Sequence, residues 1–261
     1  MRIIHHALLF ALLLFVAAGC GQQSSSENDS EPPEVQVANY RTGSDQQGPV
    51  ATKLNERRAE SKAKMPGEVM SVFASHREEL EKSNLVENAL KVGDKLPPFE
   101  LSNAFGNNVA SDELLKNGPL VLVYYRGSWC PYCNVHLQSI QESLPEIRAA
   151  GGTIVAITPE YPDESMTTVE THSLEYEVLS DPGLALARQL GLVFELTPQV
   201  DSAFAGFGLN LREHNKSDKS ELPIPATYVV NSYGEIVYAF LDVDYTYRAE
   251  PSEVIEALNK I

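Results

Sequence analysis

The chain has 261 residues, of which 43% are hydrophobic and 21% charged, which is enough apolar material for one full core or two small ones. Its 36 acidic and 20 basic residues give a formal net charge of -16. Such a charge opposes contact with phosphate backbones and anionic lipid surfaces, so nucleic acid is excluded as an expected partner.

The first nineteen residues have the features of an export signal. The uncharged apolar run over residues 7–18 is shorter than the roughly 20 residues that a membrane span needs. The run ends in Val16-Ala17-Ala18-Gly19-Cys20, which resembles the lipobox of bacterial lipoproteins, in which the cysteine is acylated. We therefore expect residues 1–19 to be a signal peptide and Cys20 to carry a lipid. The alternative is an ordinary secretory signal that is cut near Cys20.

Both forms of the signal predict an extracytoplasmic protein. With the lipid on Cys20, the protein is anchored to a bacterial membrane, on the periplasmic side or at the cell surface, and touches the membrane through that lipid only. Residues 20–50 are rich in Ser, Gln, Glu, Asp, Asn and Pro, and we expect them to form a disordered tether.

Residues 51–92 predict a helical extension. Val69, Val72 and Leu80 recur at helical spacings with charges between them. Met65-Pro66-Gly67 is expected to divide the extension into two helices, because proline interrupts a helix and the residue before it favours an extended conformation.

The remaining residues, 93–261, alternate between strand and helix patterns. Turns at residues 93–98 and 106–108 bracket a small β-hairpin. The apolar run over residues 120–125 predicts a buried central strand, and a helix follows it to about residue 150, kinked at Pro145.

Further strands and helices are predicted after this kinked helix. They are strands at 153–157 and 178–179, a polar helix near 163–176, a short helix before 190, an insertion over one sheet edge at 193–222, a hairpin at 226–240, and a last helix from Pro251. The pattern predicts an α/β domain with a central mixed sheet and flanking helices.

Cys130 and Cys133 are the two cysteines that remain once Cys20 is set aside. A cysteine at the end of a strand and the start of a helix directs its sulfur at unpaired amides and at the positive end of the helix dipole. Pro131 suits the first helical position. We therefore expect Cys130 to be the more exposed and more acidic thiol. Cys133, one turn later, is placed to form a redox-active disulfide with it.

The cysteine pair has two alternative roles. A passive disulfide is one, and half of a zinc site with His136 is the other. Zinc normally takes four ligands, and the sequence offers no second cysteine pair. We expect no metal and no resident cofactor, with His136 on a helix face.

Five motifs, in order, carry a resemblance to a known family. They are Val92-Gly93-Asp94-Lys95-Leu96-Pro97, Tyr124-Tyr125-Arg126-Gly127-Ser128-Trp129-Cys130-Pro131-Tyr132-Cys133-Asn134, Leu179-Ser180-Asp181-Pro182, Leu222-Pro223-Ile224-Pro225-Ala226-Thr227-Tyr228, and Asp242-Val243-Asp244-Tyr245-Thr246-Tyr247-Arg248-Ala249-Glu250-Pro251. With these, about residues 70–261 resemble the peroxiredoxin-like proteins of the alkyl hydroperoxide reductase and thiol-specific antioxidant group.

This resemblance implies a thioredoxin-like fold for residues 93–261, a peroxide substrate and a thioredoxin-like electron donor. It also implies that Pro225 is a cis-proline that faces the cysteines. Together with Trp129 and Arg126, Pro225 is expected to position the substrate.

The chain also departs from the family pattern. Typical peroxiredoxins have a proline seven residues and a threonine three residues before the peroxidatic cysteine, and counted back from Cys133 these positions hold Arg126 and Cys130. Their later arginine is replaced by Pro225, and the buried acid of thioredoxins is replaced by Tyr124. The groups that polarise a peroxide are thus expected to be largely absent. Arg126 either supplies charge to a thiolate or pairs with a surface acid.

The sequence favours a thiol-dependent antioxidant oxidoreductase that reduces hydroperoxides through the Cys-x-x-Cys pair. The alternative is an extracytoplasmic protein thiol-disulfide oxidoreductase, supported by the same pair, Trp129 and Pro225. Metal delivery is a third class, since some copper chaperones share this fold, but those have three residues between their cysteines and a later histidine ligand.

Overall fold

The computed structural model describes residues 47–261. The expected signal peptide, Cys20 and the tether up to residue 46 lie outside the described residues. Among residues 47–261, no helix has both the length and the apolar composition needed to cross a membrane.

Three helices precede the sheet: α1 (Pro49–Lys64), α2 (Gly67–Glu81) and the short α3 (Leu85–Asn88). The break between α1 and α2 falls at Met65, which is extended as expected for a residue that precedes proline. A residue distant in sequence, Glu250, stabilises the first turn of α1. Its buried carboxylate accepts hydrogen bonds from the amides of Val50 and Ala51, at 3.2 and 2.7 Å.

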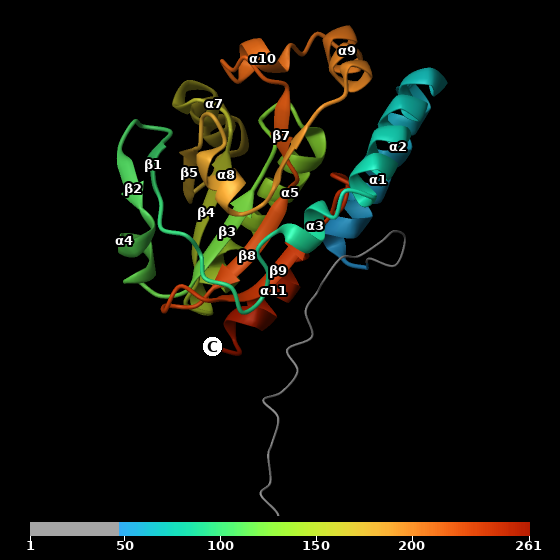
Figure 1. Cartoon of the computed structure of the whole chain (residues 1–261). Coiled ribbons are helices and arrows are strands. Elements are labelled where there is room, and N and C mark those ends of the chain that lie inside the picture. Colours follow the sequence, from blue (N-terminus) through green and yellow to red (C-terminus); the bar gives the residue numbers. More distant parts are fainter. Residues whose placement is uncertain (1–46) are drawn as a thin grey trace, which may run out of the picture. The chain divides into compact units, whose positions relative to one another are not determined.

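The central sheet has seven strands in the order β2-β1-β5-β4-β3-β8-β9 (Figure 1). β3, β4 and β5 are parallel, whereas the other neighbours pair antiparallel. The strands are β1 (Glu100–Asn103), β2 (Asn108–Ala110), β3 (Leu120–Tyr124), β4 (Thr153–Thr158), β5 (Glu177–Ser180), β8 (Ala226–Val230) and β9 (Ile236–Leu241). The predicted mixed sheet with its small hairpin is therefore present.

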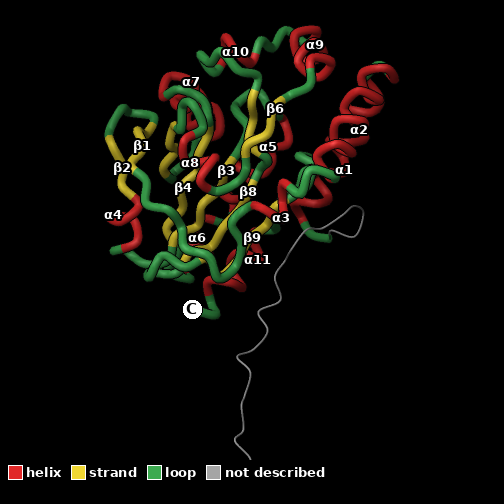
Figure 2. Tube along the Cα trace, viewed as in Figure 1, coloured by secondary structure: helices red, strands yellow, loops and turns green. Residues whose placement is uncertain are grey.

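Helices cover both faces of this sheet (Figure 2). Side chains of β3 alternate between the two: Leu122 packs in the cluster that includes residues of α3 and α8, and Val121 in the cluster that includes residues of α1, α5, α6 and α11. The remaining helices are α4 (Ser111–Leu115), α5 (Pro131–Glu142), α6 (Leu144–Ala149), α7 (Pro162–His172), α8 (Ala185–Gln189), α9 (Pro198–Gly206), α10 (Leu211–His214) and α11 (Pro251–Leu258). The kink predicted at Pro145 is a full break between α5 and α6.

The insertion does not lie over a sheet edge, which corrects the prediction from the sequence. It contains a two-stranded sheet of β6 (Val193–Glu195) and β7 (Glu221–Pro223), with α9 and α10 between them. Figure 1 shows α9 and α10 beyond one end of the central strands. Phe204 of α9 contacts Phe73 of α2 and Trp129, with ring centroids 5.4 and 5.5 Å away. The apolar residues of the insertion thus pack against α2 and the loop that carries the cysteines, so the insertion covers that loop.

A candidate redox site at the start of α5

The cysteine pair lies where the central strand β3 passes into α5. Cys130 is the N-cap of α5, and Pro131 occupies the first turn, as predicted. Both cysteines are free thiols, and both are buried, with 1% exposure for Cys130 and 0% for Cys133. Neither thiol is exposed to solvent, but Cys130, as predicted, is the more accessible of the two, because it lines the pocket at the site and Cys133 does not.

The loop between β3 and α5 depends on Gly127. Its φ of 150° lies in the region that favours glycine. A Cβ at this position would collide with the indole of Trp129 and come within 3.0 Å of Oε1 of Glu160. Glycine thus lets the loop turn tightly in front of the cysteines.

Arg248 is the polar partner of Cys133. Its Nη2 donates to the Cys133 sulfur at 3.2 Å, and its Nη1 donates to the carbonyl oxygens of Tyr245 and Tyr247. Arg248 is 2% exposed. The carbonyls of its own loop therefore fix the guanidinium against the sulfur in a place where little water can screen its charge.

The two thiols differ in acidity in the direction opposite to the prediction. Burial raises the pKa of Cys133, but a hydrogen bond with Cys130, the charges of Arg248 and Arg126, and the Arg126 backbone together lower that pKa to about 5. Burial and the hydrogen bond with Cys133 raise the pKa of Cys130 well above its usual value. The pKa of Cys133 is therefore the lower of the two, because its sulfur accepts the hydrogen bond from Cys130 and is also the sulfur that Arg248 contacts.

Arg126 does not pair with a surface acid. It is 3% exposed, and its guanidinium makes no hydrogen bond or ion pair with any other described residue. Its guanidinium instead stacks on aromatic rings, 4.1 Å from the centroid of Tyr245 and 4.9 Å from that of Trp129. Trp129 thus shapes the site through Arg126, and the charge of Arg126 acts on both cysteines.

Pro225 is buried beside the same loop. The register of β3 and β8 pairs Tyr124 with Ala226, which places Pro225 next to the segment that leads to the cysteines. Pro225 and Arg126 line one small cavity. A substrate-positioning role for Pro225, and its cis peptide bond, stay predictions.

A buried carboxylate that the sequence analysis did not single out supports the loop. Glu160 follows β4 and is 0% exposed. Its oxygens accept from the amide and hydroxyl of Ser128, at 2.8 to 3.0 Å, and from Nε2 of His214 at 2.6 Å. Glu160 thereby ties both the cysteine loop and α10 to the end of β4.

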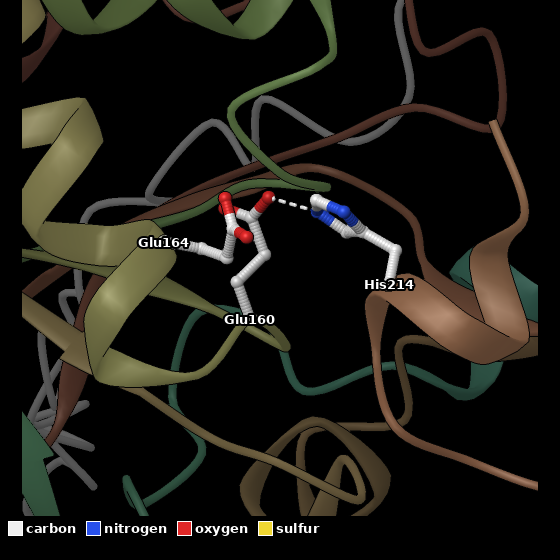
Figure 3. A group of neighbouring side chains, drawn as sticks. All are labelled: Glu160, Glu164 and His214. Atoms are coloured by element: carbon white, nitrogen blue, oxygen red, sulfur yellow. Dashed lines mark hydrogen bonds and ion pairs between the residues drawn. The ribbon is translucent and has the colours of Figure 1, made fainter. Parts of the chain in front are cut away.

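Among the described residues, one group of side chains could hold a metal ion. It consists of Glu160, Glu164 and His214, whose possible ligand atoms lie within 4.8 Å of one another (Figure 3). The oxygens of Glu160 are already used by Ser128 and His214, so the group is accounted for by hydrogen bonding. His136, considered above as a zinc ligand, is buried beside the cysteines. Burial lowers its pKa to about 3, and the charge of Arg248 acts in the same direction.

A parallel β3-β4-β5 core, an antiparallel β8-β9 hairpin and two cysteines at the start of α5 define a protein of the thioredoxin-like class. The particular family follows from sequence: residues 92–239 match the family model described as AhpC/TSA, so the chain belongs to the AhpC/TSA family.

Its relatives are peroxiredoxins. A protein of Mycobacterium tuberculosis (strain H37Rv), assigned to the peroxiredoxins, is 29% identical over 158 residues, which are 60% of this chain and 88% of that protein. Peroxiredoxin Bcp of Escherichia coli K12 is 29% identical over 106 residues, 40% of this chain and 67% of that protein.

Solved structures share the fold. Peroxidoxin BcpB of Mycobacterium tuberculosis has a TM-score of 0.53 at 19% identity, over 66% of this chain and 98% of that chain. A peroxiredoxin-like protein of Aquifex aeolicus has a TM-score of 0.52 at 16% identity, over 66% of this chain and 88% of that chain. The predicted thioredoxin-like fold is confirmed.

Proposed function

We propose that this chain is a thiol peroxidase that reduces hydroperoxides with the Cys130–Cys133 pair and takes its electrons from an external thioredoxin-like dithiol. The contact of Arg248 with the sulfur of Cys133 carries this proposal. It supports a thiolate at neutral pH, which is the form that attacks a peroxide, in a chain whose relatives are peroxiredoxins.

The reaction follows from the protonation states of the two sulfurs. The Cys133 thiolate attacks one oxygen of ROOH, the O–O bond breaks, and Cys133 becomes a sulfenic acid while RO⁻ leaves. The Cys130 thiol gives its proton to RO⁻, which departs as the alcohol ROH. The Cys130 thiolate then attacks the Cys133 sulfur, the S–S bond forms, and hydroxide leaves. The external dithiol reduces the disulfide by thiol-disulfide exchange.

Two arginines supply positive charge at a site where this chain lacks the usual peroxide-polarising groups of the family. Arg248 contacts the reacting sulfur, and Arg126 lies close enough for its charge to act on both thiols. Both are buried, so their effect on an attacking thiolate and on the charge that develops on the leaving oxygen is weakly screened.

Stopped-flow measurements with hydrogen peroxide test the assignment. Reduced Cys133→Ser is expected to consume no peroxide. Reduced Cys130→Ser is expected to complete one turnover and to leave a sulfenic acid on Cys133, which dimedone traps and mass spectrometry locates. Sulfenic acid on Cys130 in the Cys133→Ser protein, with full activity, would contradict the assignment.

Protein thiol-disulfide exchange is a second candidate, favoured by one observation. Cys130 lines the pocket at the site, whereas Cys133 is not among the lining residues. A disulfide substrate would therefore meet Cys130 first. Efficient reduction of a protein disulfide together with negligible peroxide turnover would select this function.

We also propose that Cys20 is lipidated and that the protein is held at an extracytoplasmic membrane surface. The apolar run before Cys20 and the lipobox resemblance support this location. Labelling of cells with an alkyne fatty acid is expected to mark the wild type and Cys130→Ser but not Cys20→Ala. Equal labelling of Cys20→Ala would contradict it.

A further inference from the structure

The insertion over residues 193–222 is held against the domain by two contacts of different chemistry. At α9 the contact is apolar, since Phe204 packs on Trp129 of the cysteine loop with ring centroids 5.5 Å apart. At α10 the contact is polar, since Nε2 of His214 lies 2.6 Å from Oε1 of Glu160. The second contact is an ion pair only while the histidine is protonated.

Glu160 joins α10 to the loop that carries the cysteines. Its carboxylate is 0% exposed, and the oxygen that faces His214 also accepts from the hydroxyl of Ser128 at 2.8 Å. Ser128 stands two residues before Cys130. A buried carboxylate depends on its hydrogen bonds and on a partner charge. Loss of the charge on His214 therefore weakens a contact that links the insertion to the cysteine loop.

Three carboxylates face His214 from the body of the domain. Glu160 follows β4, and Asp163 and Glu164 belong to α7. Figure 3 shows the imidazole directed at Glu160, with Glu164 beside it. The hydrogen bond with Glu160 and the charges of the carboxylates raise the pKa of His214 above its ordinary value of 6.5, although burial opposes the change. His214 thus keeps its proton to a higher pH than a free histidine.

The other charged groups near α10 do not titrate with His214. Two ion pairs of basic side chains fix this region, Lys216–Asp163 at 3.5 Å and Arg212–Asp201 at 3.7 Å. Lysine and arginine lose their protons only at a pH of about 10 or above. His76 packs on Phe194 of β6, with ring centroids 5.6 Å apart, but burial lowers its pKa. Its titration therefore falls below that of His214.

The end of α10 has two features that cost energy in its observed position. Lys216 has a φ of 48°, in the left-handed region that residues with a Cβ disfavour. Oδ1 of Asn215 is buried and has no hydrogen-bond partner among the described residues. The polar contacts of His214 and Lys216 offset these costs, so the position of α10 depends on them.

We propose that the insertion is a pH-dependent cover of the redox site. With His214 protonated, α10 stays on Glu160 and the insertion shields the cysteine loop. With His214 neutral, α10 separates from Glu160 and the loop becomes accessible to solvent. Loss of one charge-assisted hydrogen bond makes the open form about tenfold more populated. As a control of peroxide reduction the cover rests on the proposed peroxidase function, whereas its opening needs no peroxide.

Quenching of Trp129 fluorescence by acrylamide tests the cover. Trp129 is the one tryptophan of the chain and packs on Phe204, and acrylamide carries no charge that changes with pH. Between about pH 6 and about pH 9, the quenching constant of the reduced wild type is expected to rise with a midpoint above 6.5. His214→Gln should be quenched strongly throughout this range, because it lacks the charge. His214→Lys should be quenched weakly throughout, because its charge is permanent.

His172→Gln is the matched control. His172 lies at the end of α7 and contacts Gln138 of α5, so its replacement should leave the wild-type rise in quenching unchanged. A rise that persists in both His214→Gln and His214→Lys would overturn the cover, because another group would then control access. A wild-type quenching constant that does not change with pH would overturn it as well.

Peroxide consumption separates the cover from the proposed function. The pKa of Cys133 is about 5, so its thiolate is formed before the quenching of Trp129 begins to rise. Any further increase in the rate of peroxide consumption with the midpoint of His214 would come from the cover, and His214→Lys should not show it. The expected quenching without peroxide consumption at any pH would support the cover and refute the peroxidase. Peroxide consumption with quenching that does not depend on pH would refute the cover and leave the peroxidase standing.

Discussion

The guanidinium of Arg248 lies 3.2 Å from the sulfur of Cys133, although the two residues are 115 positions apart in the sequence. Nη1 of the same guanidinium donates to two carbonyls of its own loop, which leaves Nη2 directed at the sulfur. The positive charge is thus placed before any substrate arrives.

Replacing Arg248 should make the cysteine pair less acidic. In the wild type, the thiolate absorbance near 240 nm should persist at neutral pH and disappear as the pH falls through about 5. Arg248→Gln should move this midpoint up by about 1–3 pH units, the usual effect of one close opposite charge. The exposed Arg148→Gln should leave the midpoint unchanged. An unchanged midpoint in Arg248→Gln would show that Arg248 does not set the acidity of Cys133.

Asp242 should make the protein less stable as the pH rises. Burial raises the pKa of this carboxyl to about 7, and one of its oxygens is buried without a partner. The folded protein then keeps a proton that the unfolded chain loses above its ordinary pKa of about 3.9, so stability falls between about pH 4 and pH 7.

Asp242→Asn removes this titration and keeps an oxygen that accepts from the Asp244 amide. In urea titrations it should gain on the order of 1–3 kcal/mol over the wild type at pH 8 and nothing at pH 4. The exposed Asp218→Asn is the control and should change neither value. A gain of equal size at both pH values would assign the effect to packing.

The Glu160–His214 pair should show its own titration. The hydrogen bond with Glu160 raises the pKa of His214, whereas burial lowers that of His172, which serves as an internal reference. Because the folded-state pKa is raised, the stability from this pair is complete below the unfolded pKa of about 6.5 and is lost as pH rises through the folded value. NMR should find the His214 pKa above 6.5 in the wild type and lower in Glu160→Gln. Glu113→Gln, at an exposed position of α4, should leave the His214 pKa unchanged.

A side chain at residue 127, in the loop before the cysteines, should destabilise the protein. Gly127→Ala forces a Cβ against the Trp129 indole at a φ that disfavours it, and should cost about 1–3 kcal/mol of unfolding free energy and shift the Trp129 emission. Gly67→Ala in α2 is the matched control, because a Cβ there meets no atom within 4 Å. Equal stability of the two variants would show that the loop adapts.

The elements around the cysteines could be predicted because their signals are local. The apolar run of β3, Pro131 at the start of α5 and the break near Pro145 each act within a few residues. The acidity of the two thiols could not be predicted from the sequence. It depends on burial and on Arg248, which only the folded chain brings to Cys133. The motif that contains Arg248 is visible in the sequence, but nothing in it shows that the Arg248 side chain points at Cys133. Glu160 gave no signal, since an isolated acid after a strand is usually solvated.

Glu250, whose carboxylate holds the first turn of α1, stands two residues after Arg248. The family-matching segment ends at residue 239 and starts at residue 92, so both residues and the helix fall outside it. A protein trimmed to that segment would lack the counter-charge of its reactive sulfur. A protein trimmed only at its N-terminal side would leave the buried carboxylate of Glu250 without its partners in α1, two residues after Arg248. Terminal deletions far from residue 133 should therefore register first as altered thiol reactivity.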